Sequence, residues 1–162
     1  MIPANGFASL CCMSVPSKLN ILKHCRHILE DRIQVARQAM LQAQESANQE
    51  DKSSAGDKYE TSRAMGQLAR DMNARQLQEA LQSLKDLDKL EMGTSPIIIP
   101  GSLVLAENTW YMLATAIGKT EVDGLSITIL SPASPLAKQL LGKTTGKSFL
   151  FRDKSVKIDK IL

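Results

Sequence analysis

The sequence predicts an α+β protein in which a long antiparallel helical hairpin precedes a small, mostly antiparallel β-sheet with one short helix. Apolar residues recur in steps of three and four over residues 17–93, as on one face of a helix. Short apolar runs separated by turn residues follow over residues 94–162. Four of the six aromatic residues lie after residue 109, where a compact core needs them. Residues 1–16 are expected to form a disordered tail.

Pro16 and Ser17 are predicted to start the first helix, which should continue without a break because no Pro or Gly follows until Gly56. Its seam, the row of residues that faces the partner helix, should consist of Leu22, Cys25, Leu29, Ile33, Ala36, Met40, Ala43 and Ala47. The seam thins to alanine toward the turn, and alanines allow helix axes to approach to about 8 Å. We therefore expect a slender distal end, with the tip of the hairpin at about residues 48–60.

The second helix should end before Gly93 and Pro96. Its predicted seam begins with Met65, Leu68 and Met72 and shifts register near Arg75 to Leu77, Ala80 or Leu81, Leu84 and Leu87. Each helix would have about ten turns. Three apolar residues of the first helix, Ile28, Val35 and Leu41, lie off the seam and are candidates for contact with another protein.

The region after Pro96 contains the predicted strands. They are IIIP, SLVLA, WYMLATAI, LSITIL, KSFLF and SVKIDKIL, which should form a sheet of four or five strands. Between them, SPLAKQLLGK predicts a short helix with Ser134 as N-cap, Pro135 in its first turn and Gly142 at its end. Since side chains alternate along a strand, one ring of Trp110 and Tyr111 should face the core and the other solvent.

The charge of the chain is mild, with a formal net charge of +3, and does not by itself indicate nucleic-acid binding. Residues 17–93 carry 12 basic and 12 acidic residues, so the positive excess lies in residues 94–162. Cys11, Cys12 and Cys25 have no disulfide or zinc spacing. The first residues lack the basic start of a signal peptide, and no apolar run reaches membrane-spanning length. We expect a cytoplasmic protein without membrane contact.

The stretch LSITILSPASPLAKQLLGKTTGKSFLFRDKSVKIDKIL, preceded by PGSLVLAENTWYMLATAIG, resembles the C-terminal domain of the bacterial GreA/GreB transcript-cleavage factors. In that family, a sheet of this kind follows a long helical hairpin. The resemblance implies that residues 94–162 have an FKBP-like fold and dock on RNA polymerase beside its secondary channel, while residues 17–93 enter the pore. It also implies a monomer that makes only indirect contact with nascent RNA.

The resemblance further implies that the chain is not itself an enzyme. In the family, acids at the hairpin tip help hold the second Mg²⁺ of the polymerase active site, and the polymerase hydrolyses backtracked RNA. The Mg²⁺ is shared with the polymerase, and no cofactor is stably bound. The sequence agrees in having no nucleophile motif and no phosphate-binding glycine loop.

Four acids near the predicted tip are the candidate site residues, namely Glu50, Asp51, Asp57 and Glu60. The family's tip motif is Gly-Asp with a Glu three residues after the Asp, and Gly56-Asp57-Lys58-Tyr59-Glu60 has this spacing. Carboxylates three residues apart share one helix face, and Mg²⁺ prefers oxygen ligands. Asp57 and Glu60 are therefore the candidate metal ligands in the complex with polymerase.

Two alternatives for these acids stay open. With Asp57 at N-cap and Glu60 at N3, the pair would form a capping box that needs no metal. If Tyr59 is instead matched to the tyrosine that follows the family's acids, Lys52 and Ala55 occupy the acidic positions. The protein would then be a relative that blocks the channel without supporting cleavage.

The candidate polymerase-binding residues surround the short helix and are Ser134, Pro135, Lys138 and Lys143. Two other classes of function remain. One is a coiled-coil interaction module that uses the off-seam apolar residues. The other is a peptidyl-prolyl isomerase, which needs a deep aromatic pocket. For that pocket the sheet offers Trp110, Tyr111, Phe149 and Phe151.

Overall fold

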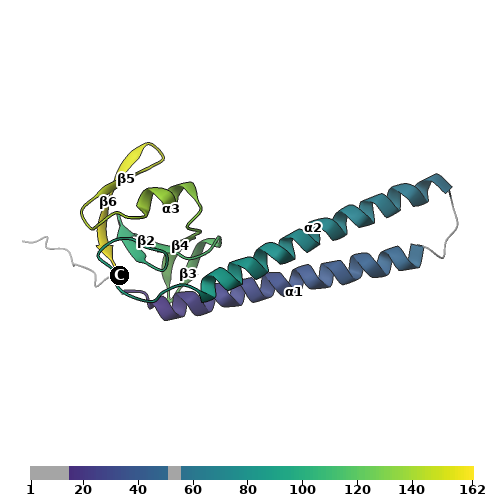
Figure 1. Ribbon diagram of the computed structural model, residues 1–162, viewed down its shortest axis with the longest axis horizontal. Coiled ribbons are helices and arrows are strands. Elements are labelled where there is room, and N and C mark those ends of the chain that lie inside the picture. The colour runs from purple at the N-terminus through teal and green to yellow at the C-terminus, as the bar shows by residue number, and fades with distance from the viewer. Residues whose placement is uncertain (1–14, 51–55) are drawn as a thin grey trace, which may run out of the picture.

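A long helical hairpin stands on one side of a small β-sheet (Figure 1). The structure is a computed structural model that describes the backbone of residues 15–50 and 56–162, and the side chains of residues 15–46 and 60–162. Helix α1 spans Lys18–Glu50 and helix α2 spans Gly56–Asp88. The predicted tail lies outside the described residues except for Val15 and Pro16, of which Pro16 is buried. The α+β class is confirmed.

The sheet has six strands in the order β3-β4-β2-β1-β6-β5, which is more than the four or five predicted. The strands are β1 (Leu103–Ala106), β2 (Thr109–Leu113), β3 (Gly118–Val122), β4 (Leu125–Leu130), β5 (Ser148–Phe151) and β6 (Lys154–Ile161). Strands β2 and β4 pair in parallel, and the other pairs are antiparallel. The parallel pair arises because the β3–β4 hairpin folds back and places β4 between β2 and β3.

Two of the predicted strands were wrong. IIIP contributes only an isolated bridge between Ile97 and Thr144. WYMLATAI is a strand only as far as Leu113, and the prediction missed β3, whose sequence GKTEV contains a single buried residue, Val122. An edge strand with so few buried side chains carries little hydrophobic signal.

The short helix α3 (Pro135–Leu140) confirms its prediction in detail. The Ser134 hydroxyl accepts a hydrogen bond from the backbone N–H of Ala137 at 3.2 Å, which caps the helix. Pro135 is its first residue, and Gly142 follows its end with φ 76°, a conformation that favours glycine.

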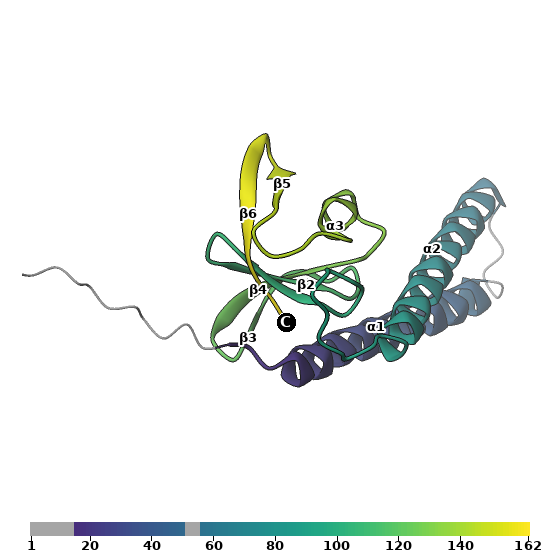
Figure 2. The same cartoon turned by 60° about the vertical axis from the view of Figure 1, so that its left-hand side comes forward.

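Both faces of the sheet are covered (Figure 2). The core between the sheet and the hairpin base consists of Ile21, Cys25, Leu29, Leu87, Leu103, Trp110, Met112, Ala114, Val122, Ile127 and Ile129. The core beneath α3 consists of Ile98, Val104, Ala106, Tyr111, Leu113, Ala137, Leu140, Phe149, Val156 and Ile158. Because Trp110 and Tyr111 point into opposite cores, both are buried, and the prediction that one ring faces solvent was wrong.

The seam prediction holds for the proximal half of α1. Cys25, Leu29, Ile33 and Ala36 are all buried. Ile21 takes the innermost position in place of the predicted Leu22, because α1 meets the sheet as well as α2 at that level.

The seam prediction was wrong for the distal half of α2. Met65, Leu68 and Met72 are 66%, 57% and 57% exposed. The less exposed positions follow the frame set at the base and include Leu87, Leu84, Ala80, Leu77, Asn73, Gly66 and Ser62. Helix α2 is unbroken, so the spacing of the less exposed positions continues from the base toward the tip. The apolar stripe of Met65, Leu68 and Met72 therefore lies one residue away from the positions that face α1.

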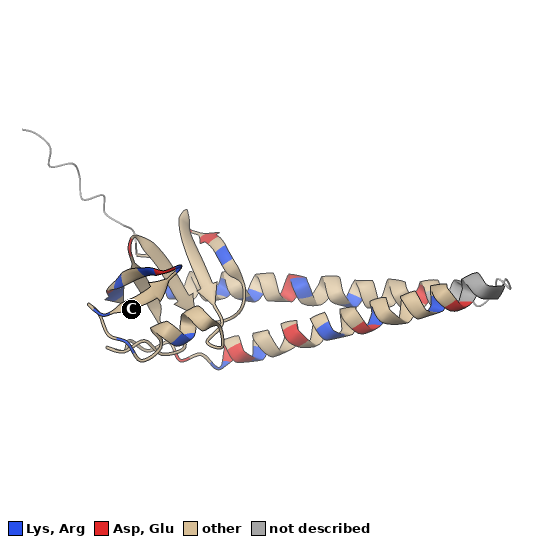
Figure 3. Ribbon diagram, turned by 90° about the horizontal axis from the view of Figure 1, so that it is seen from above, with Lys and Arg blue, Asp and Glu red and all other residues tan. Residues whose placement is uncertain are grey.

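The slender distal end expected from the alanines stays a prediction. The two helices run side by side from the base to the distal half, and they separate toward the tip in the view of Figure 1 but draw together in the view from above (Figure 3). Long polar side chains bridge them there, with Arg70 Nη1 donating to Gln44 Oε1 at 3.0 Å. No helix within the described ranges is both long and apolar enough to cross a membrane.

Candidate functional site

Three of the predicted tip acids, Glu50, Asp57 and Glu60, lie at the end of the hairpin that is farthest from the sheet. Helix α2 begins at Gly56, so Asp57 lies within the first turn instead of preceding it as the N-cap. Glu60 is exposed. Asp51 and the side chains of Glu50 and Asp57 lie outside the described residues, so the Mg²⁺ site stays a prediction. Among the described side chains, no three His, Cys, Asp or Glu residues form a metal-ligand group.

The predicted polymerase-binding residues gather at the opposite end of the molecule, around α3. Pro135 and Lys138 are exposed, and the Ser134 hydroxyl is engaged in capping. Lys143 Nζ donates to the backbone oxygen of Ser148 at 2.6 Å. Since each long helix has 33 residues, the hairpin separates this face from the tip by about 50 Å.

A groove of about 390 Å³ lies between α3 and β5. It is lined by Lys138, Gln139, Leu141, Lys143, Ser148, Phe149, Leu150 and Ser155. Gln139 Oε1 accepts a hydrogen bond from the backbone N–H of Leu150 at 3.1 Å. The sequence analysis identified both lysines but missed Gln139 and Leu150, because their relation depends on α3 lying beside a strand edge that the sequence does not show.

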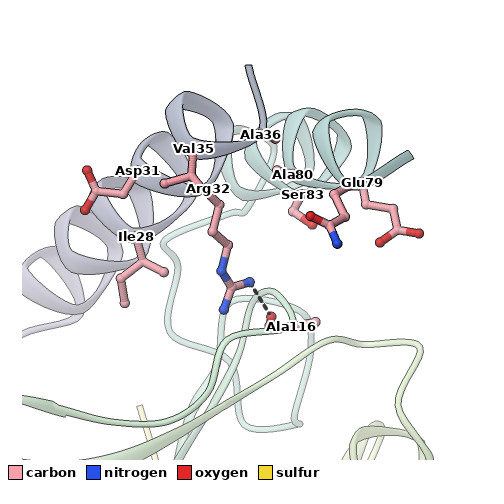
Figure 4. A pocket seen from close by; sticks show the side chains of 10 residues that line it. Ile28, Asp31, Arg32, Val35, Ala36, Glu79, Ala80, Ser83 and Ala116 are labelled. Atoms are coloured by element: carbon pink, nitrogen blue, oxygen red, sulfur yellow. Dashed lines mark hydrogen bonds between the residues drawn. The ribbon is translucent and has the colours of Figure 1, made fainter. Parts of the chain in front are cut away.

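A larger cleft of about 610 Å³ opens between the hairpin and the loop that precedes β3 (Figure 4). Its lining residues are Ile28, Asp31, Arg32, Val35, Ala36, Gln76, Glu79, Ala80, Ser83 and Ala116. Arg32 reaches across it, and its Nη1 donates to the carbonyl oxygen of Ala116 at 3.2 Å. The carboxylates of Asp31 and Glu79 point away from Arg32 toward the two edges (Figure 4). The charged groups of these three residues therefore do not converge on one point in the cleft.

Polar side chains of α1 attach the hairpin to β3 and to the turn that follows it. Asn20 Nδ2 donates to Asp123 Oδ2 at 2.9 Å, and His24 Nε2 lies 2.9 Å from Thr120 Oγ1. Asn20, His24 and Arg32 are spaced by multiples of four residues, so they lie in one line along α1. The sequence analysis missed these contacts because each joins residues that are far apart in the chain.

The buried thiol and aromatic groups do not form an open reactive site. Burial raises the pKa of the Cys25 thiol to about 11, which keeps it protonated and unreactive near neutral pH. Burial also raises the pKa of Tyr111. Trp110 and Tyr111 are buried in two cores on opposite sheet faces, so these two rings do not line one aromatic pocket of the kind that an isomerase would need.

Comparison with known proteins adds a distant similarity to solved structures. No protein-family model matches the chain, and no curated protein matches it significantly. Among the solved structures that match is that of the transcription factor Gfh1. It aligns over 86% of this chain and 94% of that chain with 21% sequence identity and a TM-score of 0.32.

Proposed function

We propose that the protein is a Gre-like regulator of transcription elongation that binds RNA polymerase beside its secondary channel and inserts its hairpin into the pore. The observation that supports this most is a hairpin joined to the sheet only at its base and projecting far beyond it (Figure 1). The motifs of residues 101–162 quoted above support the same assignment.

The distribution of charge supports different roles for the hairpin and for the sheet end of the molecule. Blue and red residues alternate along the hairpin (Figure 3), and residues 17–93 have no net charge. The positive excess lies in residues 94–162. A balanced hairpin can enter a confined channel without strong like-charge repulsion, while a basic sheet end steers binding to an acidic surface. We infer that the sheet end provides most of the affinity.

The tip acids would then act only inside the complex. A two-metal site uses its second cation to stabilise the attacking and leaving oxygens of phosphoryl transfer. Carboxylate oxygens of Asp57 and Glu60 would coordinate that cation, which belongs to the polymerase. The chain itself would supply positioning and charge, and the polymerase would perform hydrolysis.

A binding experiment with bacterial core RNA polymerase and the full chain tests the docking step. Reversing two charges in Lys138→Glu/Lys143→Glu should weaken binding about tenfold or more and reduce its salt dependence. The matched control is Lys23→Glu/Lys85→Glu, which makes the same charge change on the hairpin and should bind within about threefold of wild type. Absence of wild-type binding contradicts the proposed function. Equal binding by both double variants contradicts the docking face.

A transcript-cleavage assay on stalled elongation complexes tests the tip. Asp57→Asn and Glu60→Gln keep the size of each side chain but remove the charge that the cation needs, so cleavage should fall at least about tenfold while unfolding stays unchanged. If the wild-type chain binds polymerase but promotes no cleavage at any Mg²⁺ concentration, the alignment that places Lys52 and Ala55 at the acidic positions is the better one. The protein is then a channel-blocking relative.

A second candidate, a coiled-coil interaction module, is favoured by exposed apolar residues on the hairpin. Val35 and Leu41 are 67% and 64% exposed, as predicted, whereas Ile28 is partly buried in the cleft. Sedimentation velocity over a range of concentrations distinguishes the two candidates. A self-association that Val35→Gln and Leu41→Gln abolish, together with no polymerase binding, would favour the module.

A further inference from the structure

The free edge of β5 is the feature of the molecule that most clearly fits an additional ligand. We propose that this edge binds an extended, acidic peptide segment of a partner protein as an additional β-strand. Strand β5 is the last in the strand order, and its neighbour is β6. Edge strands bind extended peptides through main-chain hydrogen bonds, and side-chain pockets then select the sequence.

The hairpin geometry determines which backbone groups point to this edge. Residues 152–153 form a two-residue turn with φ of 49° and 64°, the values of a type I′ hairpin. In such a hairpin the residues that flank the turn exchange hydrogen bonds, and alternate residues follow. Phe151 and Phe149 therefore bond to β6, and Ser148 and Leu150 direct their backbone groups to the open side.

Two side chains already form hydrogen bonds with the backbone groups that an added strand would use. Lys143 Nζ donates to the Ser148 carbonyl oxygen at 2.6 Å, and Gln139 Oε1 accepts from the Leu150 N–H at 3.1 Å. An incoming strand would replace them with a backbone N–H and a backbone C=O. Both side chains are flexible and belong to α3 or the loop after it, so they can leave without breaking any pair in the sheet.

The surroundings of the edge indicate the chemistry of the segment. Residues 138–160 contain seven Lys or Arg and two Asp, which favours acidic side chains on the ligand. The groove of about 390 Å³ beside the edge offers room, and the Leu150 side chain is 61% exposed and can pack against an apolar residue of the segment. A peptide unit supplies the donor that Ser148 needs and the acceptor that Leu150 needs. A phosphate offers acceptors alone, so a peptide fits better than a nucleic acid.

The peptide acetyl-Glu-Val-Glu-Val-Glu-Val-amide is the probe, tested by NMR on the ¹⁵N-labelled full chain. Addition of up to roughly 1 mM peptide should shift the amide signals of residues 148–151 and the side-chain amide of Gln139. The matching Lys-Val peptide should cause much smaller shifts. No shift at these residues, or equal shifts with the two peptides, contradicts the proposal. Because this probe does not involve RNA polymerase, its result is independent of the proposed function.

Variants at the edge separate strand addition from simple charge attraction. Leu150→Pro removes the outward N–H at an edge position that tolerates proline, and should weaken peptide binding about tenfold. Leu150→Ala keeps that N–H and should bind within about threefold of wild type.

Gln139→Ala releases the same N–H and should bind the peptide a few-fold more tightly. Unchanged or weaker binding contradicts displacement of Gln139, and this variant decides the matter if Leu150→Pro does not fold. A twelve-residue oligo-dT that binds the edge as tightly as the peptide, in wild type and in Leu150→Pro alike, shows a general anion surface and contradicts the proposal.

Discussion

The base of the hairpin and its distal half have similar helical patterns but opposite environments. Leu29 at the base is 1% exposed, whereas Leu68 in the distal half is 57% exposed. At the base, the sheet provides a third surface that covers both helices. Farther out, each helix can cover only one stripe of its partner. The periodicity of apolar residues shows which side chains share a face, but only the tertiary structure shows whether anything covers that face.

The strongest test of this contrast is the pair Leu29→Ala and Leu68→Ala. The first leaves a cavity between hairpin and sheet and should lower the free energy of unfolding by about 2–5 kcal/mol. The second removes the same atoms from an exposed position and should change it by about 0.5 kcal/mol or less. Urea unfolding of the full chain measures both. Equal losses at the two positions would show that the distal half is packed as tightly as the base.

A second test uses the thiol at the base. The pKa of Cys25 is raised by burial to about 11, above its value in the unfolded chain. Between roughly pH 9 and pH 11 the unfolded state releases a proton that the folded state keeps, so stability falls as pH rises. The loss should be on the order of 2 kcal/mol. Urea unfolding at several pH values should show a shallower decline for Cys25→Ala than for wild type, since Tyr111 titrates in both. Equal slopes would mean that Cys25 is accessible to water.

The features that the sequence predicted well are those set by local chemistry. Ser134 and Pro135 start α3 because a capping hydroxyl and a fixed φ act on the adjacent backbone. The features that it missed depend on distant segments. The parallel pairing of β2 with β4, the contact of His24 in α1 with β3, and the Gln139–Leu150 hydrogen bond each require knowledge of which elements lie side by side.

The apolar stripe of α2 was also misplaced by the sequence prediction, by one residue along the helix. Met72 precedes Asn73, and Met65 precedes Gly66, by one position. One position on a helix corresponds to a rotation of about 100°. Packing at the base fixes which face of α2 meets α1. Because the helix is unbroken, the stripe is therefore rotated out of the interface. For the tip acids the limit is different, since their proposed role needs a second molecule to complete the site.

A smaller effect is expected from the ion pair of Arg26 with Asp88, which joins α1 to α2 at the base. Both side chains are about half exposed, at 48% and 49%, so solvent screens their attraction. Arg26→Ala should lower the free energy of unfolding by about 0.2–1 kcal/mol, and the loss should shrink in high salt. In the distal half, Arg70→Ala should cost less still. A larger loss at Arg70 than at Arg26 would reverse the contrast between the two regions.

The smallest effect per substituted residue is predicted for the triple variant Met65→Gln/Leu68→Gln/Met72→Gln. Gln has nearly the same helix propensity as Met and Leu, so the substitution removes apolar surface without weakening the helix itself. Because all three side chains are more than half exposed, the free energy of unfolding should stay within about 1 kcal/mol of wild type.

The control for this variant is Leu77→Gln/Leu84→Gln, which changes two partly buried positions of the same helix and should cost about 2 kcal/mol or more. If the triple variant loses as much as the control, α2 has turned in solution to place the stripe against α1, and the seam expected from the sequence forms after all. If it loses nothing, the stripe faces water in the free protein. Its three apolar side chains then remain available to a partner of the distal hairpin, while the core at the base maintains the fold without them.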